Sequence, residues 1–152
     1  MINKLSRKVK AAVIKQQLEQ QKNPSTKLHS NLDANLKLIS STFSSSDFKM
    51  RKFYLDIDRL IGVAVCYING IADEEKISNF VIKPIQAKEL ASEVVATWTI
   101  DHIRDLLIAP AEINSSETLE AAVAKIANGS TVLLLDGSSE FLVLDLRSWE
   151  QR

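Results

Sequence analysis

The stretch TVLLLDGSSEFLVLDL, residues 131–146, decides the fold predicted for this chain. Two almost purely apolar runs flank the segment Asp136-Gly137-Ser138-Ser139. Short apolar runs that are bounded by a glycine-containing turn are typical of buried strands. Gly137 supplies a positive φ and Asp136 is expected to bond to its own backbone, so the segment predicts a tight turn. We therefore expect a hairpin of two buried strands, 131–136 and 140–146.

An earlier part of the chain predicts a second hairpin. Phe53, Leu55 and Ile57 alternate with polar or amphipathic residues, which indicates a strand with one buried face. The run LIGVAVCYI, residues 60–68, is apolar on both faces and therefore predicts a central strand. Only Asp58-Arg59 separates the two, so they are expected to pair antiparallel.

Helical patterns fill the remaining chain. Ser30-Asn31-Leu32-Asp33 has the spacing of a capping box, and an apolar stripe follows it as far as Phe43. Asp73 is expected to cap a second helix, which Pro84 ends or kinks because proline has no backbone donor. Further helices are expected at 89–96, at 99–108, and from Ser115 or Ser116 to a stop at Asn128-Gly129.

This order of elements predicts an α/β domain over residues 31–152, with a four-stranded mixed sheet built from two β-hairpins and flanked by helices. A chain of 152 residues with 45% hydrophobic and 25% charged residues is ordinary for one soluble domain. Residues 1–30 form a separate basic tail and linker. Seven Lys and Arg stand against one acid there, which leaves twelve basic and eighteen acidic residues in the rest.

The tail has apolar residues about every four positions, so it predicts a basic amphipathic helix. Such a helix is compatible with a solvated segment and also with contact to an anionic membrane surface or an acidic partner. No aromatic residue accompanies its charges and the body is acidic, so nucleic acid is not an expected partner.

The sequence offers little catalytic chemistry. His29 and His102 lie far apart with no third histidine, so no metal site is expected. Cys66 lies inside the central strand, where a thiol behaves as a small apolar group, and helix capping accounts for the acids 73–75. No glycine-rich phosphate loop is present. We expect a protein that is not an enzyme and uses no cofactor.

Two groups of residues are candidates for binding. Asp136, Ser138 and Ser139 form the turn of the second hairpin, where a ligand contact is the alternative to a purely structural role. Arg147, Trp149 and Glu150 follow the last strand directly. An aromatic residue among charges is characteristic of contact surfaces, so this group predicts contact with an adjacent domain, and the alternative is that Trp149 packs on the core of its own domain.

Three blocks resemble, in order and spacing, the N-terminal region of the A subunit of GerA-type spore germinant receptors. They are residues 31–55, 63–85 and 129–152. Within the second block the match consists of a strand end and a helix end: Tyr67, Ile68, Gly70, Lys83, Pro84 and Ile85. In the third block Ser148 stands where the family has glycine.

The resemblance implies that a second similar subdomain and a membrane domain follow in a longer protein. It also implies a receptor of A, B and C subunits in the spore inner membrane, with several A subunits together, which senses a nutrient. The resemblance also implies that this region lies on the core side, and a basic tail on that side agrees with the positive-inside tendency. The function it implies is receptor assembly and signal transduction. The alternative is a module that binds a small ligand together with the adjacent subdomain.

Overall fold

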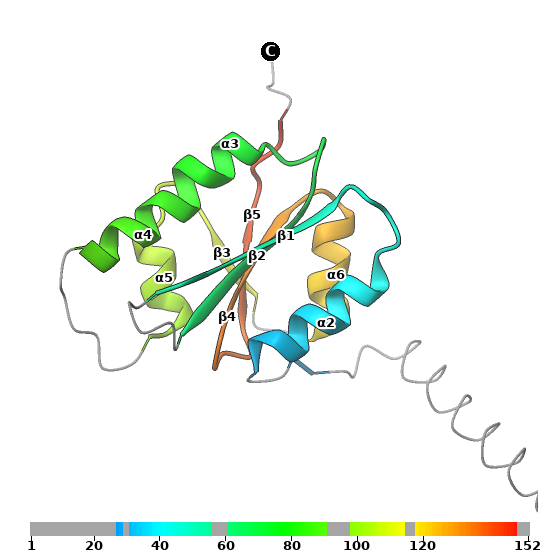
Figure 1. The fold of residues 1–152 in the computed structure, drawn as a ribbon, viewed down its shortest axis with the longest axis horizontal. Helices are drawn as coiled ribbons and strands as arrows, with labels where there is room; N and C mark the ends of the chain where they lie inside the picture. The colour runs from blue at the N-terminus through cyan, green and yellow to red at the C-terminus, as the bar shows by residue number, and fades with distance from the viewer. Residues whose placement is uncertain (1–26, 29–30, 56–60, 91–97, 115–117, 149–152) are drawn as a thin grey trace, which may run out of the picture.

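The structure is a computed structural model that describes residues 27–28, 31–55, 61–90, 98–114 and 118–148. Within these residues a central sheet is covered by helices on both faces (Figure 1). Helices α2 (Leu32–Thr42) and α6 (Leu119–Ala127) lie on one face. The other face carries α3 (Glu74–Ile77), the π-helical segment η1 (Ser78–Ile82), α4 (Lys83–Leu90) and α5 (Ile100–Leu106).

In the described part of the chain the sheet has five strands in the order β1-β2-β4-β5-β3, and every neighbouring pair is antiparallel. The strands are β1 (Phe48–Tyr54), β2 (Gly62–Ile68), β3 (Glu112–Asn114), β4 (Thr131–Leu135) and β5 (Phe141–Leu144). The α/β class and both hairpins are therefore confirmed. The predicted count of four strands is wrong, because the three-residue β3 adds an edge strand beside β5. The predicted mixed sheet is also wrong, because all of these pairs are antiparallel.

The two central strands divide the core into two halves. Val63, Val65 and Tyr67 of β2 face the layer of α3 to α5, whereas Ala64 and Cys66 face α2 and α6. All five residues are at most 1% exposed. A strand that is buried on both faces reads as a continuous apolar run, which is why its pattern was visible in the sequence.

The first strand differs from its prediction. β1 begins at Phe48, whereas the alternating pattern indicated a start near Phe53, and Ile57 lies outside the described residues. Residues 49–52 are all exposed, because β1 pairs with β2 and forms one edge of the sheet. An exposed edge strand has no apolar alternation to reveal where it starts.

Two helix caps also lie elsewhere than predicted. Asn31, not Ser30, caps α2, and its side-chain oxygen accepts a hydrogen bond from the backbone N–H of Ala34 at 3.0 Å. Thr118 caps α6 in place of Ser115 or Ser116, and accepts from Ala121 at 3.2 Å. Runs of Ser, Thr and Asn contain several residues that suit a cap, so the sequence locates a cap only to within a few positions.

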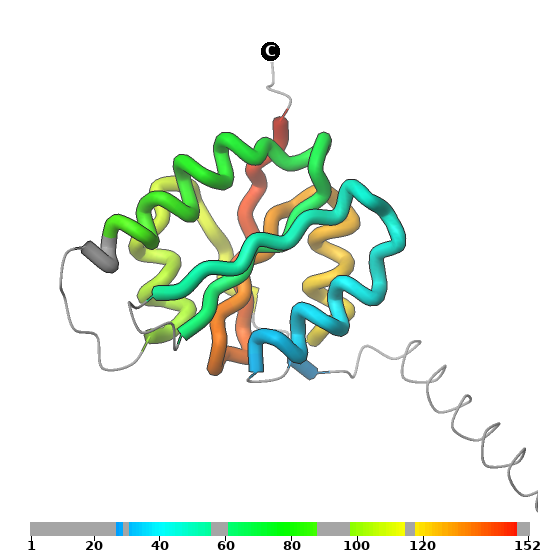
Figure 2. Tube along the Cα trace, in the orientation of Figure 1, coloured from blue at the N-terminus to red at the C-terminus, as the bar shows by residue number. Residues whose placement is uncertain are grey.

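The proline at position 84 does not end its helix. α3, η1 and α4 follow one another as a continuous helical rod, which Figure 2 traces from residue 74 to residue 87. Pro84 has no N–H to offer to the carbonyl of Phe80, one turn earlier. That carbonyl instead accepts from the backbone N–H of Ile108 at 3.2 Å, just after α5. The proline thus frees an acceptor that ties the rod to α5.

The predicted helices at 89–96 and 99–108 are found in part. α4 ends at Leu90 and residues 91–97 lie outside the described part. α5 begins after Thr99, where Thr99 and His102 form a reciprocal capping box. In the described residues no helix has the length and apolar character to cross a membrane.

Candidate functional site

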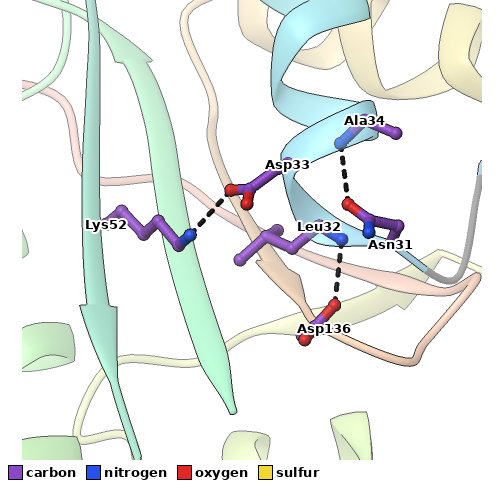
Figure 3. Close-up of polar contacts among 6 residues, drawn as sticks. All are labelled: Asn31, Leu32, Asp33, Ala34, Lys52 and Asp136. Carbon is purple, nitrogen blue, oxygen red and sulfur yellow. Dashed lines mark hydrogen bonds and ion pairs between the residues drawn. The ribbon is translucent and has the colours of Figure 1, made fainter. Parts of the chain in front are cut away.

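The hairpin loop of the sequence prediction joins β4 to β5, and its first residue reaches another element. The carboxylate Oδ1 of Asp136 accepts a hydrogen bond from the backbone N–H of Leu32 at 2.9 Å (Figure 3). Leu32 is the first residue of α2, so its N–H has no partner within the helix. A carboxylate at a helix N-terminus also interacts favourably with the helix dipole. Asp136 therefore caps a distant helix, and the expected bond to its own turn is not what the structure shows.

The serines of the loop differ in their surroundings. The Ser138 hydroxyl accepts from the N–H of Glu140 at 3.1 Å and lies 3.2 Å from the carbonyl of the same residue. These bonds close a local turn at Ser139, and the N–H of Ser138 donates to the carbonyl of Leu135 at 3.1 Å, which closes the turn that contains Gly137. Gly137 has φ of 86°, as predicted. Ser139 is half-buried. Asp136 and Ser138 thus have structural partners within the described chain.

A charged pair lies beside the Asp136 cap. Lys52 of β1 reaches Asp33 of α2, with 2.6 Å between Nζ and Oδ1 (Figure 3). This bond raises the pKa of Lys52. The Asp33 side chain is largely exposed, so the pair contributes little to stability. The pair joins the first turn of α2 to the edge strand.

A second cluster forms where the chain leaves β5. Leu146 accepts at its carbonyl from the N–H of Asp73 at 2.7 Å, and the N–H of Ser148 donates to Ile71 at 2.8 Å. The Ser148 hydroxyl adds a bond to the carbonyl of Gly70 at 3.0 Å. Residues 146–148, which we call the exit segment, are thereby held against the turn between β2 and α3.

Arg147 of the exit segment binds residues of its own domain. Its Nη2 donates to the carbonyl of Asn128 at 3.0 Å, at the C-terminus of α6, where a cation is favourable. Its Nε lies 3.0 Å from Oδ1 of Asp145. Its carbonyl accepts from Nζ of Lys76 at 3.0 Å. Contact of Arg147 with an adjacent domain stays a prediction, and Trp149 and Glu150 lie outside the described residues.

The two candidate groups lie at opposite ends of the sheet. The loop from Asp136 lies with the start of α2 at the lower end in Figure 1, while the exit segment lies at the upper end beside α3. The structure therefore does not bring Asp136, Ser138 and Ser139 together with Arg147. Among the described residues, therefore, the loop residues and Arg147 do not form a single site.

Comparison with known proteins identifies the family of this chain. Residues 34–152 match the family described as Bacillus/Clostridium GerA spore germination protein, which is most of the described body. The chain belongs to the GerA family. The resemblance drawn from the three sequence blocks is thereby confirmed at the level of the family, and with it a connection to spore germination.

Two proteins that are similar to this GerA-family chain can be compared with it in identity and matched length. The spore germination protein GerLA of Bacillus cereus is 27% identical over 89 residues, which is 59% of this chain and 18% of the relative. The chain thus matches less than a fifth of that protein's length. The crystal structure of the N-terminal domain of the A subunit of the Bacillus megaterium spore germinant receptor GerK3 has a TM-score of 0.49. It is 14% identical, over 83% of this chain and 98% of that chain.

The other residues that the sequence singled out are buried, cap a helix or make a local hydrogen bond in this GerA-family domain. Cys66 is fully buried, and burial raises the pKa of its thiol to about 12. Asp73 caps α3 as predicted, accepting from the N–H groups of Glu75 and Lys76. Burial, together with the hydrogen bond of 2.7 Å that the Tyr67 hydroxyl donates to Glu74, raises the pKa of Tyr67 to about 12. Among the described residues, no group of three or more His, Cys, Asp and Glu side chains could hold a metal ion.

Sequence reasoning missed residues whose role depends on tertiary structure. Gly129 was expected only to end α6, and it does so with φ of 96°. A Cβ on Gly129 would also lie 2.8 Å from Nη1 of Arg147 and 2.5 Å from a methyl group of Ile71. The Arg147 side chain therefore packs directly against Gly129, and the absence of a Cβ there makes room for it. A glycine placed 18 residues before an arginine carries no local signal of this.

Proposed function

We propose that this domain is the soluble N-terminal domain of a germinant receptor A subunit, and that it takes part in nutrient-triggered spore germination through receptor assembly and signal transduction. The family match over residues 34–152 carries the proposal. In this proposal the full-length protein lies in the spore inner membrane, with this domain on the core side. Its partners are the B and C subunits and other A subunits.

The exit segment supports a mechanical role. The backbone and side-chain bonds from residues 146–148 to the turn before α3 fix the direction in which the chain leaves the domain. A rigid exit passes on the orientation of the domain to whatever follows it, whereas a flexible linker would not. Both uses of the domain, assembly and signal transduction, need such a fixed geometry. Catalysis has no part in this proposal.

The alternative, a module that binds a small ligand with an adjacent subdomain, has less support. Asp136 and Ser138, the polar groups that would recognise a ligand, are bonded to Leu32 and Glu140. They also lie at the end of the sheet that is opposite to the exit segment. A ligand between two consecutive subdomains would be expected near the exit instead.

Deletion of the gene followed by complementation tests the proposal. With a subset of nutrients, spores that lack the gene should germinate more slowly or not at all, as measured by the fall in optical density. They should germinate normally when exogenous dipicolinate bypasses the receptors. An affinity-tagged full-length copy should restore the response and co-purify with B and C subunits from spore membranes. A normal response to every nutrient in the deletion strain would contradict a role in germination. Restoration without co-purifying subunits would contradict the assembly role alone.

A further inference from the structure

The edge strand β1 has an outer side that is not paired within the described chain. β1 is seven residues long and pairs with β2 alone, whereas the opposite edge of the sheet is the three-residue β3. The strand order places β1 at the edge of the sheet, next to β2. A long edge strand presents a row of backbone donors and acceptors to which another strand can pair.

The register identifies which backbone groups point outward. Leu55 donates its N–H to Ile61, and Asp47 accepts from Asn69, so these odd-numbered residues face β2. Hydrogen-bonded and non-bonded pairs alternate along an antiparallel ladder. The N–H and C=O groups of Met50, Lys52 and Tyr54 therefore point away from β2. Three consecutive outward positions are enough to pair with a short extended segment.

The two faces of β1 carry different exposed side chains. One face is basic, and the other has an exposed apolar residue. Lys49 and Arg51 lie two residues apart on one face, and both are exposed. Met50 lies on the other face and is 42% exposed, and only two other large hydrophobic side chains of the described residues are exposed. A complementary strand would carry acids opposite Lys49 and Arg51, and an apolar residue opposite Met50.

We propose that the outer edge of β1 is a docking site for an extended, acidic segment of another polypeptide, which adds to the sheet as a sixth strand. Main-chain hydrogen bonds would supply affinity, and the alternation of acidic and apolar side chains would supply specificity. The proposal rests on the edge strand alone, so it stands or falls separately from the role in germination.

A second copy of β1 fits this edge less well. An antiparallel pair of β1 strands centred on Arg51 would place the two arginines directly opposite each other, and like charges in that position are destabilising. Lysine and arginine on an edge strand also protect it against such self-pairing. An acidic strand is the partner that this protection does not repel.

Amide hydrogen exchange with two probe peptides tests the proposal. One peptide alternates Glu and Val, and its control alternates Lys and Val at the same length. At millimolar concentration the Glu-Val peptide should slow exchange at the amides of Met50, Lys52 and Tyr54 by about threefold or more. Amides of Lys49, Arg51 and Phe53, which face β2, should not change. Equal effects of the two peptides, or no protection by the Glu-Val peptide, would overturn the proposal.

Two kinds of variant sharpen the test. Met50→Pro removes an outward N–H and leaves the bonds to β2 in place, so it should abolish the protection at Lys52 and Tyr54. Met50→Ala, its matched control, should retain most of it. Lys49→Glu with Arg51→Glu should reverse the preference toward the Lys-Val peptide. Lys37→Glu with Lys83→Glu, exposed lysines on helices, should leave the preference unchanged.

One outcome of the exchange experiment would show that a second copy of the chain, and not an acidic segment, binds the edge. If the outward amides are protected without peptide, in proportion to protein concentration, then a second copy of the chain occupies the edge. That result would overturn the proposal in favour of self-association, which sedimentation measurements would confirm.

Discussion

Asp136 accepts a hydrogen bond at 2.9 Å from the backbone N–H of Leu32, which lies 104 residues earlier in the chain. The bond joins the hairpin between β4 and β5 to the start of α2 (Figure 3). It explains why an acidic residue begins this loop, since the first N–H groups of a helix need an acceptor. The first residue of this loop therefore has a structural role, and a ligand contact of the loop stays a prediction.

Removal of this carboxylate should destabilise the domain. Asp136→Ala leaves the N–H of Leu32 without its acceptor, so the free energy of unfolding should fall by about 1–2 kcal/mol. Asp136→Asn keeps an acceptor oxygen and should cost less. Ser139→Ala, in the same loop, is the control and should change stability by less than about 0.5 kcal/mol. Denaturant unfolding of the 152-residue chain measures all three, and equal stabilities of the Ala variant and the parent would refute the capping role.

Two glycines with positive φ should respond differently to alanine. Gly137→Ala introduces only the backbone strain of φ at 86°, because no atom lies within 4 Å of the added Cβ. Its cost should be about 1 kcal/mol, and that of Gly137→Val should be larger. Gly129→Ala combines φ at 96° with contacts at 2.5 Å to Ile71 and 2.8 Å to Arg147.

Gly129→Ala should therefore cost about 2–4 kcal/mol. Gly129→Ala with Arg147→Ala should recover part of that loss, because one of the two clashing groups is removed. Thermal unfolding of the variants gives the order directly. Equal losses at the two glycines would show that the exit segment is not packed on Gly129.

Features of the fold could be predicted from the sequence where their pattern lies within a few neighbouring residues. The central strand at 62–68, the hairpin after Thr131 and the stop at Gly129 were predicted because their patterns lie within a few residues. The start of β1 and all of β3 were missed, since edge strands lack alternation and three residues carry no pattern. The role of Asp136 and the packing of Arg147 on Gly129 were missed because both depend on contacts between distant segments.

The thiol of Cys66 should be unreactive in the folded domain. Burial raises its pKa from an ordinary 9.0 to about 12, so at pH 8 its thiolate is about a thousandfold rarer than that of a free thiol. A disulfide reagent should therefore label Cys66 only as fast as the domain unfolds, and labelling should accelerate with denaturant. Rapid labelling of the native chain would place Cys66 near the surface and contradict the packing of β2.

Stability should fall at alkaline pH because of Tyr67. Its folded pKa, about 12, lies above the ordinary value of 10.0, since burial and the bond to Glu74 disfavour the phenolate. The stabilising difference is complete below pH 10 and is lost as pH rises from 10 to 12. Over that window this group contributes at most about 1.4 kcal/mol per pH unit. Tyr67→Phe should flatten the dependence of the unfolding free energy on pH, and an unchanged slope would contradict the assignment.

The most direct test of the proposed role in receptor assembly and signalling uses Trp149, directly after the exit segment. Trp149→Ala should change the melting temperature of the 152-residue chain by less than about 2 °C, because its expected contact is with another domain. In spores that carry the full-length protein, the same change should lower receptor abundance or slow nutrient-triggered germination. Gln86→Ala, at an exposed site on α4 outside the three matching blocks, serves as the control. Unchanged germination at normal receptor abundance, or a large loss of stability in the isolated chain, would contradict the account.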